Sequence, residues 1–226
     1  MNWSARRINK IAKINNAQTY LEIGVRTGQT FLDVDIAFKD GVDPVFRFDT
    51  KSVESDKVRF FTQTSDAFWT QGQARSYDVI MIDGLHTFEQ TFRDLLASFQ
   101  YAHRKTVWLI DDTLPSDVFS AMPDQTASFR ERDKLKVPGR PWHGDVFKII
   151  PAIHDFLPTL NYATIFRSGN PQTLAWYGPR QNFKPRLNNL ETISRMGFFD
   201  IQKVLPLFKF ASEDAAFEAL GAAFAD

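Results

Sequence analysis

The feature that most constrains the fold of this chain is a repeated alternation of short apolar segments with helical ones. Apolar runs that predict strands occupy residues 19–24, 38–44, 57–63, 77–83 and 106–112. The clearest is "YDVIMID", where four apolar residues in a row are bounded by Asp78 and Asp83. Strands that alternate with helices predict an α/β fold, with a mostly parallel sheet, helices on both faces and right-handed crossovers.

Helical periodicity is clearest directly after the fourth of these strands. One apolar stripe at helical spacing is formed by Phe88, Phe92, Leu95, Leu96 and Phe99. Thr87 and Gln90 fit a capping box in front of it. Further helices are predicted behind a cap at Ser4, from Gly28 to Val34, at 65–74 and at 144–157.

The second half of the chain predicts additions to this core. "NYATIFRS" and "QTLAWYG" flank a Gly-Asn-Pro turn and predict an antiparallel pair of strands. We expect one domain over residues 1–178 and a helical extension over 179–226, with helices near Leu187 to Met196 and from Ser212. The apolar "FFDIQKVLPLFKF" in this extension either covers the domain or forms a homodimer contact.

Composition excludes several classes of function. Lysine plus arginine and aspartate plus glutamate number 27 each, so no overall field attracts nucleic acid or an anionic membrane. The chain has no cysteine, which excludes disulfides, thiolate metal sites and cysteine nucleophiles. The first sixteen residues show no apolar run of signal-peptide length, so we expect a cytoplasmic protein.

Polar residues and glycines gather where the predicted strands end. They are Glu22, Gly24, Asp43, Ser65, Asp66, Asp83, His86, Asp111 and Asp112. Ligands of open α/β sheets bind beyond the carboxyl ends of the strands, so these residues predict a ligand site. Some of them are expected to be ordinary helix caps, but capping does not account for so much acid on one rim.

The turn in "YLEIGVRTGQTF" indicates which ligand the rim holds. Gly24 and Gly28 lack the glycine between them that lets a backbone approach a pyrophosphate, and no Lys-Ser or Lys-Thr pair follows, as a P-loop requires. Glu22 suits a ligand with an ammonium or sulfonium group. Asp43, about 20 residues on, has the spacing of a carboxylate that binds ribose hydroxyls. An adenosine cofactor that is cationic and has no diphosphate points to S-adenosylmethionine.

These motifs resemble those of the class I S-adenosylmethionine-dependent methyltransferases, in particular a bacterial branch with an "IDG-x-H-(S/T)-(Y/F)-E" signature. The similar segments are "YLEIGVRTGQTF", "GVDP", "TSDAFW", "YDVIMIDGLHTFEQTFRDL", "VWLIDDTLPSD" and "WHGDVFK". The resemblance covers roughly residues 18 to 178. It implies a Rossmann-like, doubly wound sheet of seven strands, mostly parallel with one antiparallel strand.

The resemblance also implies roles for individual residues. The turn around the methionine half of the cofactor would be formed by Glu22, Gly24, Val25, Arg26 and Gly28. Asp43 would hold the ribose, Ser65 and Asp66 would lie along the adenine edge, and Asp83 would close the site. Arg26 replaces a glycine that is usual in the family.

The acceptor side of the site needs a group that activates a hydroxyl. Asp83, Asp111 and Asp112 offer the hard oxygen ligands that suit Mg²⁺ or Mn²⁺, or else the last two cap the following turn. His86 is the first candidate for a general base and His143 the second. His103, at the end of its predicted helix, and His154 are interpreted as structural.

The connection over residues 113–142 is longer than a loop that only joins two elements, and it is interpreted as a lid over the acceptor. We expect it to be helical near Val118 to Met122. Five basic residues within it suggest an anionic acceptor such as a nucleotide sugar, unless they form a solvated charge run: Arg130, Arg132, Lys134, Lys136 and Arg140.

Three functions from different classes follow. The chain is expected to be an O-methyltransferase acting on a small-molecule or carbohydrate hydroxyl, with S-adenosylmethionine as cofactor and Mg²⁺ as a further candidate. The first alternative is an NAD(P)-dependent Rossmann oxidoreductase, against which the missing glycine argues. The second is a protein that binds S-adenosylmethionine without turnover.

Overall fold

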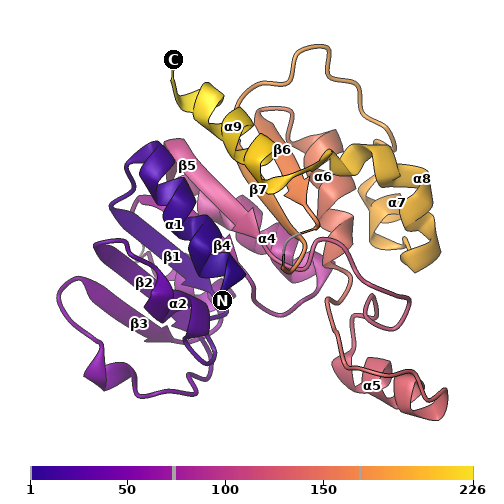
Figure 1. Ribbon diagram of the computed structural model, residues 1–226, viewed down its shortest axis with the longest axis horizontal. Helices are drawn as coiled ribbons and strands as arrows, with labels where there is room; N and C mark the ends of the chain where they lie inside the picture. The colour runs from indigo at the N-terminus through magenta and orange to yellow at the C-terminus, as the bar shows by residue number, and fades with distance from the viewer. Residues whose placement is uncertain (1, 73–74, 168, 226) are drawn as a thin grey trace.

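The protein, represented by a computed structural model, is described over residues 2–72, 75–167 and 169–225, and forms an eight-stranded sheet with the order β3-β2-β1-β4-β5-β7-β6-β8 (Figure 1). The strands are β1 Thr19–Ile23, β2 Phe38–Asp43, β3 Val58–Thr62, β4 Tyr77–Ile82, β5 Ala102–Ile110, β6 Leu160–Ile165, β7 Gln172–Tyr177 and β8 Phe210–Ala211.

The sheet confirms the predicted topology. Strands β1 to β5 pair in parallel, whereas β7 is antiparallel to both β5 and β6. The expected number of seven strands is wrong by one, because the two residues of β8 pair with β6 in parallel. Ile23 pairs in register with Val42 and with Ile82, and Ile82 pairs with Ile110. The residues that follow β1, β2, β4 and β5 therefore meet at one edge of the sheet.

Helices cover both faces of the sheet. The α-helices are α1 Trp3–Asn15, α2 Gln29–Asp33, α3 Ser65–Thr70, α4 Phe88–Ser98, α5 Gln125–Lys134, α6 Ile149–Phe156, α7 Leu190–Ser194, α8 Ile201–Val204 and α9 Glu213–Phe224. The short 3-10 helices are η1 Thr50–Ser52, η2 Phe99–Tyr101, η3 Val146–Lys148, η4 Phe198–Asp200 and η5 Leu205–Phe208.

Alternate residues of the central strands supply two separate hydrophobic cores. Ile80 and Ile82 of β4 pack with α3, α4 and α6 on one face. Val79 and Met81 pack with α1, α2 and α9 on the other. This period of two is what a strand buried on both faces requires. Figure 1 shows that α1 and α9 are neighbours although they come from opposite ends of the chain.

Several local predictions are wrong. Asn2, not Ser4, caps α1 through its side-chain oxygen. Leu96 lies outside the buried stripe of α4, with 42% of its surface exposed. His103 lies on β5 rather than at the end of a helix.

The capping box in front of α4 is only half formed. Thr87 accepts a hydrogen bond from the Gln90 backbone N–H at 3.4 Å. The Gln90 side chain does not reciprocate but donates to Ser65 and Asp66 instead.

Two of the predicted elements include residues outside the described ranges. Helix α3 ends at Thr70, and Gln73 and Ala74 of its predicted range lie outside the described residues. The same holds for Ser168, at the end of the predicted strand that became β6.

The long connection and the C-terminal segment differ in how they pack. The helix of the connection is α5, and the expected helix near Val118 to Met122 is a series of turns. Figure 1 shows α5 standing away from the sheet. Ile201, Val204 and Phe208 of the C-terminal segment are buried in the core beside α6. Within the described ranges, no helix has the length and apolar character to span a bilayer.

Candidate active site

The glycine turn after β1 is built to lie against the end of β4. Gly24 has a φ of +95°, and a Cβ atom on it would come within 1.9 Å of the Asp83 carbonyl oxygen, so only glycine fits there. Gly28, with a φ of +77°, is the N-cap of α2 and donates its backbone N–H to the carbonyl of Val25 at 2.8 Å. Arg26 also adopts a left-handed conformation, with a φ of 45°. The turn therefore keeps its shape although arginine replaces the usual glycine.

Asp43, at the end of β2, binds the backbone of this turn through its carboxylate. One carboxylate oxygen accepts the Arg26 backbone N–H at 2.8 Å, and the other accepts the Val45 N–H at 2.7 Å. Each oxygen keeps a second lone pair. The side chain is thus held in place and can still accept a hydrogen bond from a ligand hydroxyl.

A pocket of about 460 Å³ lies between this turn and the ends of β2 and β4. It is lined by Ile23, Gly24, Arg26, Val42, Asp43, Pro44, Val45, Arg47, Gln63, Thr64, Ser65, Asp66, Gly84, Leu85 and Gln90. Val45 and Leu85 are apolar yet 60% and 63% exposed. Their exposure in a pocket suits a planar apolar ligand such as a nucleobase. The sequence analysis missed both residues, and the only local signal was an apolar residue placed among polar ones.

Glu22 lies beneath the turn and is buried. The Tyr20 hydroxyl donates a hydrogen bond to it at 2.6 Å. Burial raises the pKa of Glu22 to about 8, although the Tyr20 hydrogen bond and the charge of Lys39 act in the opposite direction. In the free protein this side chain is therefore largely neutral near pH 7, and a cationic ligand would favour its ionised form.

The acids that follow β4 and β5 form one cluster. Burial and the neighbouring Asp112 raise the pKa of Asp111 to about 7. The pKa of Asp83 is raised well above its usual value by burial first and by Asp111 and Asp112 next. Such crowding of like charges at one point of a fold marks a functional site more often than a structural one.

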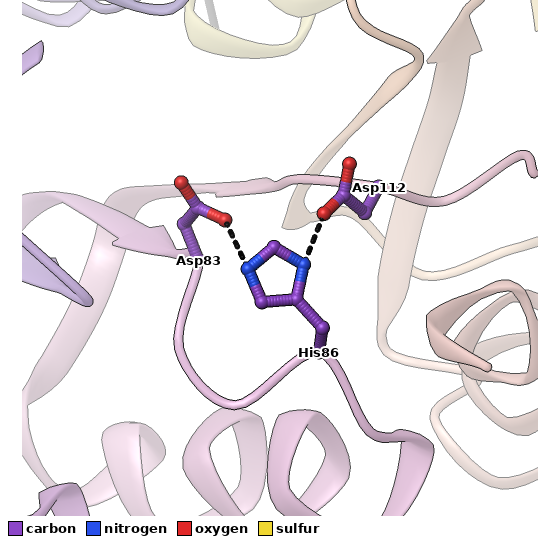
Figure 2. A group of neighbouring side chains, drawn as sticks. All are labelled: Asp83, His86 and Asp112. Carbon is purple, nitrogen blue, oxygen red and sulfur yellow. Dashed lines mark ion pairs between the residues drawn. The ribbon is translucent and has the colours of Figure 1, made fainter. Parts of the chain in front are cut away.

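His86 lies between two of these acids, as Figure 2 shows. Its Nδ1 atom pairs with Asp112, and its Nε2 atom is 3.7 Å from an oxygen of Asp83. His86 has a φ of 57° and Asp112 a φ of 59°, so both stand on left-handed turns that few non-glycine residues adopt. Two strained residues in direct contact are typical of a functional site.

The segment "WHGD", residues 142–145, holds the turn of His86 in place. The Trp142 ring stacks on the His86 ring with 4.7 Å between centroids. A Cβ on Gly144 would come within 1.6 Å of the His86 carbonyl oxygen. Asp145 accepts the Phe88 backbone N–H at 2.7 Å, at the start of α4. The sequence analysis recognised this motif but assigned a role only to His143.

His143, the second candidate base, lies behind Asp112 rather than at the open side of the site. Its Nε2 atom is 4.0 Å from Asp112, and its buried Nδ1 atom has no hydrogen-bond partner among the described residues. The site thus brings His86 and Asp112 into contact and leaves His143 as a buried neighbour. His103 and His154 are remote from it and pair with Asp78 and Tyr162.

A second pocket, of about 520 Å³, opens over His86. Its lining includes Asp83, His86, Gln125 and Trp142, and it shares Gly24, Arg26, Asp43, Arg47, Gly84 and Leu85 with the first pocket. Two adjoining pockets with a common wall suit a cofactor and an acceptor held side by side.

One group of side chains has the spacing of a metal site. Asp83, His86 and Asp112 each offer one ligand atom, and these atoms lie within 4.8 Å of one another. Asp111, which we also expected to be a ligand, is not in this group, and its Oδ1 atom accepts hydrogen bonds from Asn170 and Gln172. Two carboxylates and one imidazole fit a divalent cation, but Mn²⁺ or Zn²⁺ better than the all-oxygen ion Mg²⁺.

The basic residues of the long connection are mostly neutralised within it. Arg132 pairs with Asp117, Arg140 with Asp133, and both Arg130 and Lys134 with Glu131. These cations therefore offer little to an anionic acceptor. Two arginines that line both pockets, Arg26 and Arg47, make no ion pair with a described residue.

Comparison with known proteins finds a matching family model and a shared fold. Residues 21–113 match the family model of a methyltransferase domain. No curated protein matches the chain significantly in sequence.

Solved structures share the fold at low sequence identity. A cofactor-bound protein from MTB, Rv0187, has a TM-score of 0.54 and 14% identity, covering 78% of this chain and 80% of that one. An O-methyltransferase from Bacillus cereus in complex with SAH has a TM-score of 0.51 and 12% identity, covering 79% and 82%. The plantazolicin methyltransferase BpumL has a TM-score of 0.51 and 14% identity, covering 79% and 86%.

The matched residues 21–113 run from β1 to the end of β5 and include the glycine turn and the acids after β4 and β5. This part of the chain therefore matches a methyltransferase domain in sequence, and the whole sheet has the fold that the solved structures share.

Proposed function

We propose that the protein transfers a methyl group from S-adenosylmethionine to a hydroxyl oxygen of a small polar acceptor, with His86 as the general base. One observation carries this proposal: an imidazole at the wall of the second pocket, with one nitrogen paired to Asp112 and the other directed toward Asp83 (Figure 2). The structural relative from Bacillus cereus is named an O-methyltransferase.

The cofactor would occupy the first pocket and reach into the second. Asp43 would accept hydrogen bonds from the ribose hydroxyls, and Val45 and Leu85 would contact the adenine, with Ser65 and Asp66 along its edge. Gly24 and its neighbours would surround the methionine half above Glu22, whose ionised form a cationic ligand favours. This arrangement brings the sulfonium to the boundary with the second pocket.

The residues of the second pocket would then prepare the acceptor. Asp112 accepts the Nδ1 proton of His86, which fixes the tautomer with a free lone pair on Nε2. Nε2 removes the proton of the acceptor hydroxyl as the oxygen attacks the methyl carbon. The bond from sulfur to methyl breaks while the bond from oxygen to methyl forms, so the products are the methyl ether and S-adenosylhomocysteine. Alignment of the two reactants within adjoining pockets contributes most to the rate.

A divalent cation is a further candidate at this site. Asp83, His86 and Asp112 would hold it, and it would lower the pKa of the acceptor hydroxyl when bound. The lone pair on Nε2 of His86 can bind a cation or accept a proton, but not both at once. The role of metal ligand and the role of general base can therefore be told apart by experiment. Thermal shifts with Mn²⁺ and with Mg²⁺ test this directly, and loss of the Mn²⁺ shift in Asp83→Asn would support a site.

Charge at the pocket wall favours an anionic acceptor, with nucleotide sugars as the leading class. The Arg26 and Arg47 side chains make no ion pair with a described residue, and both residues line both pockets. The Arg47 backbone N–H donates to the carbonyl of Arg26 at 2.7 Å, so the two residues lie side by side along the backbone. Guanidinium groups at a pocket wall are well suited to bind phosphate.

The decisive experiment measures binding and turnover separately. Calorimetry with S-adenosylhomocysteine and with NAD identifies the cofactor. Production of S-adenosylhomocysteine is then followed with a panel of sugars, nucleotide sugars and catechols, with and without EDTA. Binding of S-adenosylhomocysteine with methylation of a hydroxyl supports the proposal. Binding without turnover of any acceptor would favour a non-catalytic role, and preference for NAD would favour an oxidoreductase.

A further inference from the structure

The turn between β6 and β7 contributes a side chain to the acid cluster. The Asn170 amide nitrogen donates to Oδ1 of Asp111 at 2.5 Å and to Oδ1 of Asp112 at 2.7 Å. One NH₂ group therefore bridges two adjacent carboxylates, which are 8% and 5% exposed. The sequence analysis interpreted Asn170 only as part of a turn.

Asn170 is itself held from behind by a buried arginine of α1. The NH1 atom of Arg7 donates to the Asn170 carbonyl oxygen at 2.8 Å and to the Gln172 side-chain oxygen at 2.6 Å. Gln172 in turn donates to Asp111 at 3.2 Å. Arg7 and Gln172 are both 0% exposed, so water does not compete for these hydrogen bonds.

The C-terminal helix completes the network. The Nε atom of Arg7 donates to Glu213, the first residue of α9, at 3.2 Å. Burial lowers the pKa of Arg7, whereas Glu213 and Asp111 raise it, so both acids stabilise this buried cation. Contacts thus run from α9 through α1 and the β6–β7 turn to the acids at the end of β5.

This network has a consequence for the orientation of Asp112. Two neighbouring carboxylates repel each other and would turn apart unless a donor bridges them. Asn170 engages Oδ1 of Asp112, which leaves Oδ2 as the atom that contacts His86. The position of the Asp112 carboxylate, and with it the tautomer of His86, is therefore tied to a residue that lines no wall of the His86 pocket.

We propose that Asn170 is a positioning residue for methyl transfer, which aligns Asp112 with His86, and that Arg7 and Glu213 hold Asn170 in place. The assignment rests on the proposed role of His86. It predicts that the two ends of the chain control the catalytic turn although neither contacts the acceptor.

The test compares Asn170→Ala with the unaltered protein in two measurements. The first is turnover with whichever acceptor of the panel is methylated. We expect kcat to fall about 10- to 100-fold, the usual cost of removing a partner that orients a functional side chain. The acceptor KM and the Kd for S-adenosylhomocysteine should stay near the wild-type values. The second is the long-range ¹H–¹⁵N spectrum of labelled histidine, assigned with His86→Gln, in which the Nδ1 signal of His86 should shift.

Matched variants separate positioning from folding. Asn182→Ala alters an exposed asparagine that also has a positive φ, and should change neither measurement. Glu213→Gln keeps the shape of its side chain and should move the His86 signal in the same direction as Asn170→Ala, but less. Arg7→Lys keeps the charge and should retain more activity than Arg7→Met.

Each outcome bears on the proposal. An unchanged His86 signal and unchanged kcat in Asn170→Ala would overturn it. So would a fall in kcat accompanied only by a lower melting temperature, because that indicates a purely structural role. If the unaltered protein methylates no acceptor, the proposed function fails, and the His86 signal by itself decides whether Asn170 positions Asp112.

Discussion

The carbonyl oxygen of His86 lies 1.6 Å from the point that a Cβ atom on Gly144 would occupy. Any residue with a Cβ atom at position 144 would collide with the His86 carbonyl, so only glycine allows the two backbone segments to approach this closely. The long connection after β5 therefore returns to the sheet at one defined point, under the turn that carries the proposed base.

The first prediction concerns this contact. Gly144→Ala must displace the His86 turn, and we expect a large loss of kcat together with about 1–3 kcal/mol of destabilisation from the left-handed backbone alone. Gly72→Ala is the matched control, because Gly72 also has a positive φ, of +64°, but has no atom within 4 Å of its Cβ position. Urea unfolding and turnover measure both effects. Equal losses of activity in the two variants would show that the contact with His86 is unimportant.

The second prediction addresses the base. His86→Asn should lower kcat by a factor of about 10²–10⁴, the usual contribution of a general base. The Kd for S-adenosylhomocysteine should change little, because the adenosine half of the cofactor would bind in the first pocket, which does not include His86. His103→Asn is the control, since His103 pairs with Asp78 on the opposite end of the sheet. A His86→Asn enzyme with normal kcat would exclude the proposed mechanism.

The third prediction concerns the charge of the acceptor. Arg26→Ala and Arg47→Ala should each raise the KM for a nucleotide sugar by about 10-fold or more, as expected for the loss of a hydrogen bond to a charged group. The effect should weaken at high salt, because both arginines are exposed. Arg104→Ala, at an exposed site on β5, is the control. An increase in the Kd for S-adenosylhomocysteine, with no change in the acceptor KM, would instead assign the arginines to the cofactor.

The fourth prediction follows from the buried acid under the glycine turn. The pKa of Glu22 is raised from 4.5 to about 8 in the folded protein, so the folded state keeps a proton that the unfolded chain has released. Between these two values the free energy of unfolding should fall as pH rises, by about 1.4 kcal/mol per pH unit for one proton.

The Glu22→Gln variant has no titratable carboxyl at this position, so it is the comparison for the unaltered protein. Its unfolding free energy should depend less steeply on pH between about 5 and 8 than that of the unaltered protein. Urea unfolding at several pH values measures the two slopes. If they are the same, Glu22 does not hold a proton in the folded state. Saturating S-adenosylmethionine should flatten the slope of the unaltered protein, because a cation favours the ionised carboxyl.

Much of the fold could be predicted because its signals are local. Strand β4 is recognisable from four consecutive apolar residues, and α4 from apolar residues at helical spacing behind Thr87. The turn after β1 is recognisable from Gly24 and Gly28 directly behind an apolar strand. By contrast, β8 has only two residues and depends on its pairing with β6, which no local pattern reveals.

The sequence by itself also determined which residues end the strands, and so that acids, a histidine and a glycine turn would share one edge of the sheet. Only the tertiary structure decided how they are arranged there. His86 contacts Asp112, and the "WHGD" segment, more than fifty residues later, packs against the turn that carries His86. Asn170 reaches Asp111 and Asp112 because β7 pairs antiparallel with β5. Contacts of this kind depend on strand order and on packing between distant segments, whereas the composition of the strand ends depends on the sequence next to each strand.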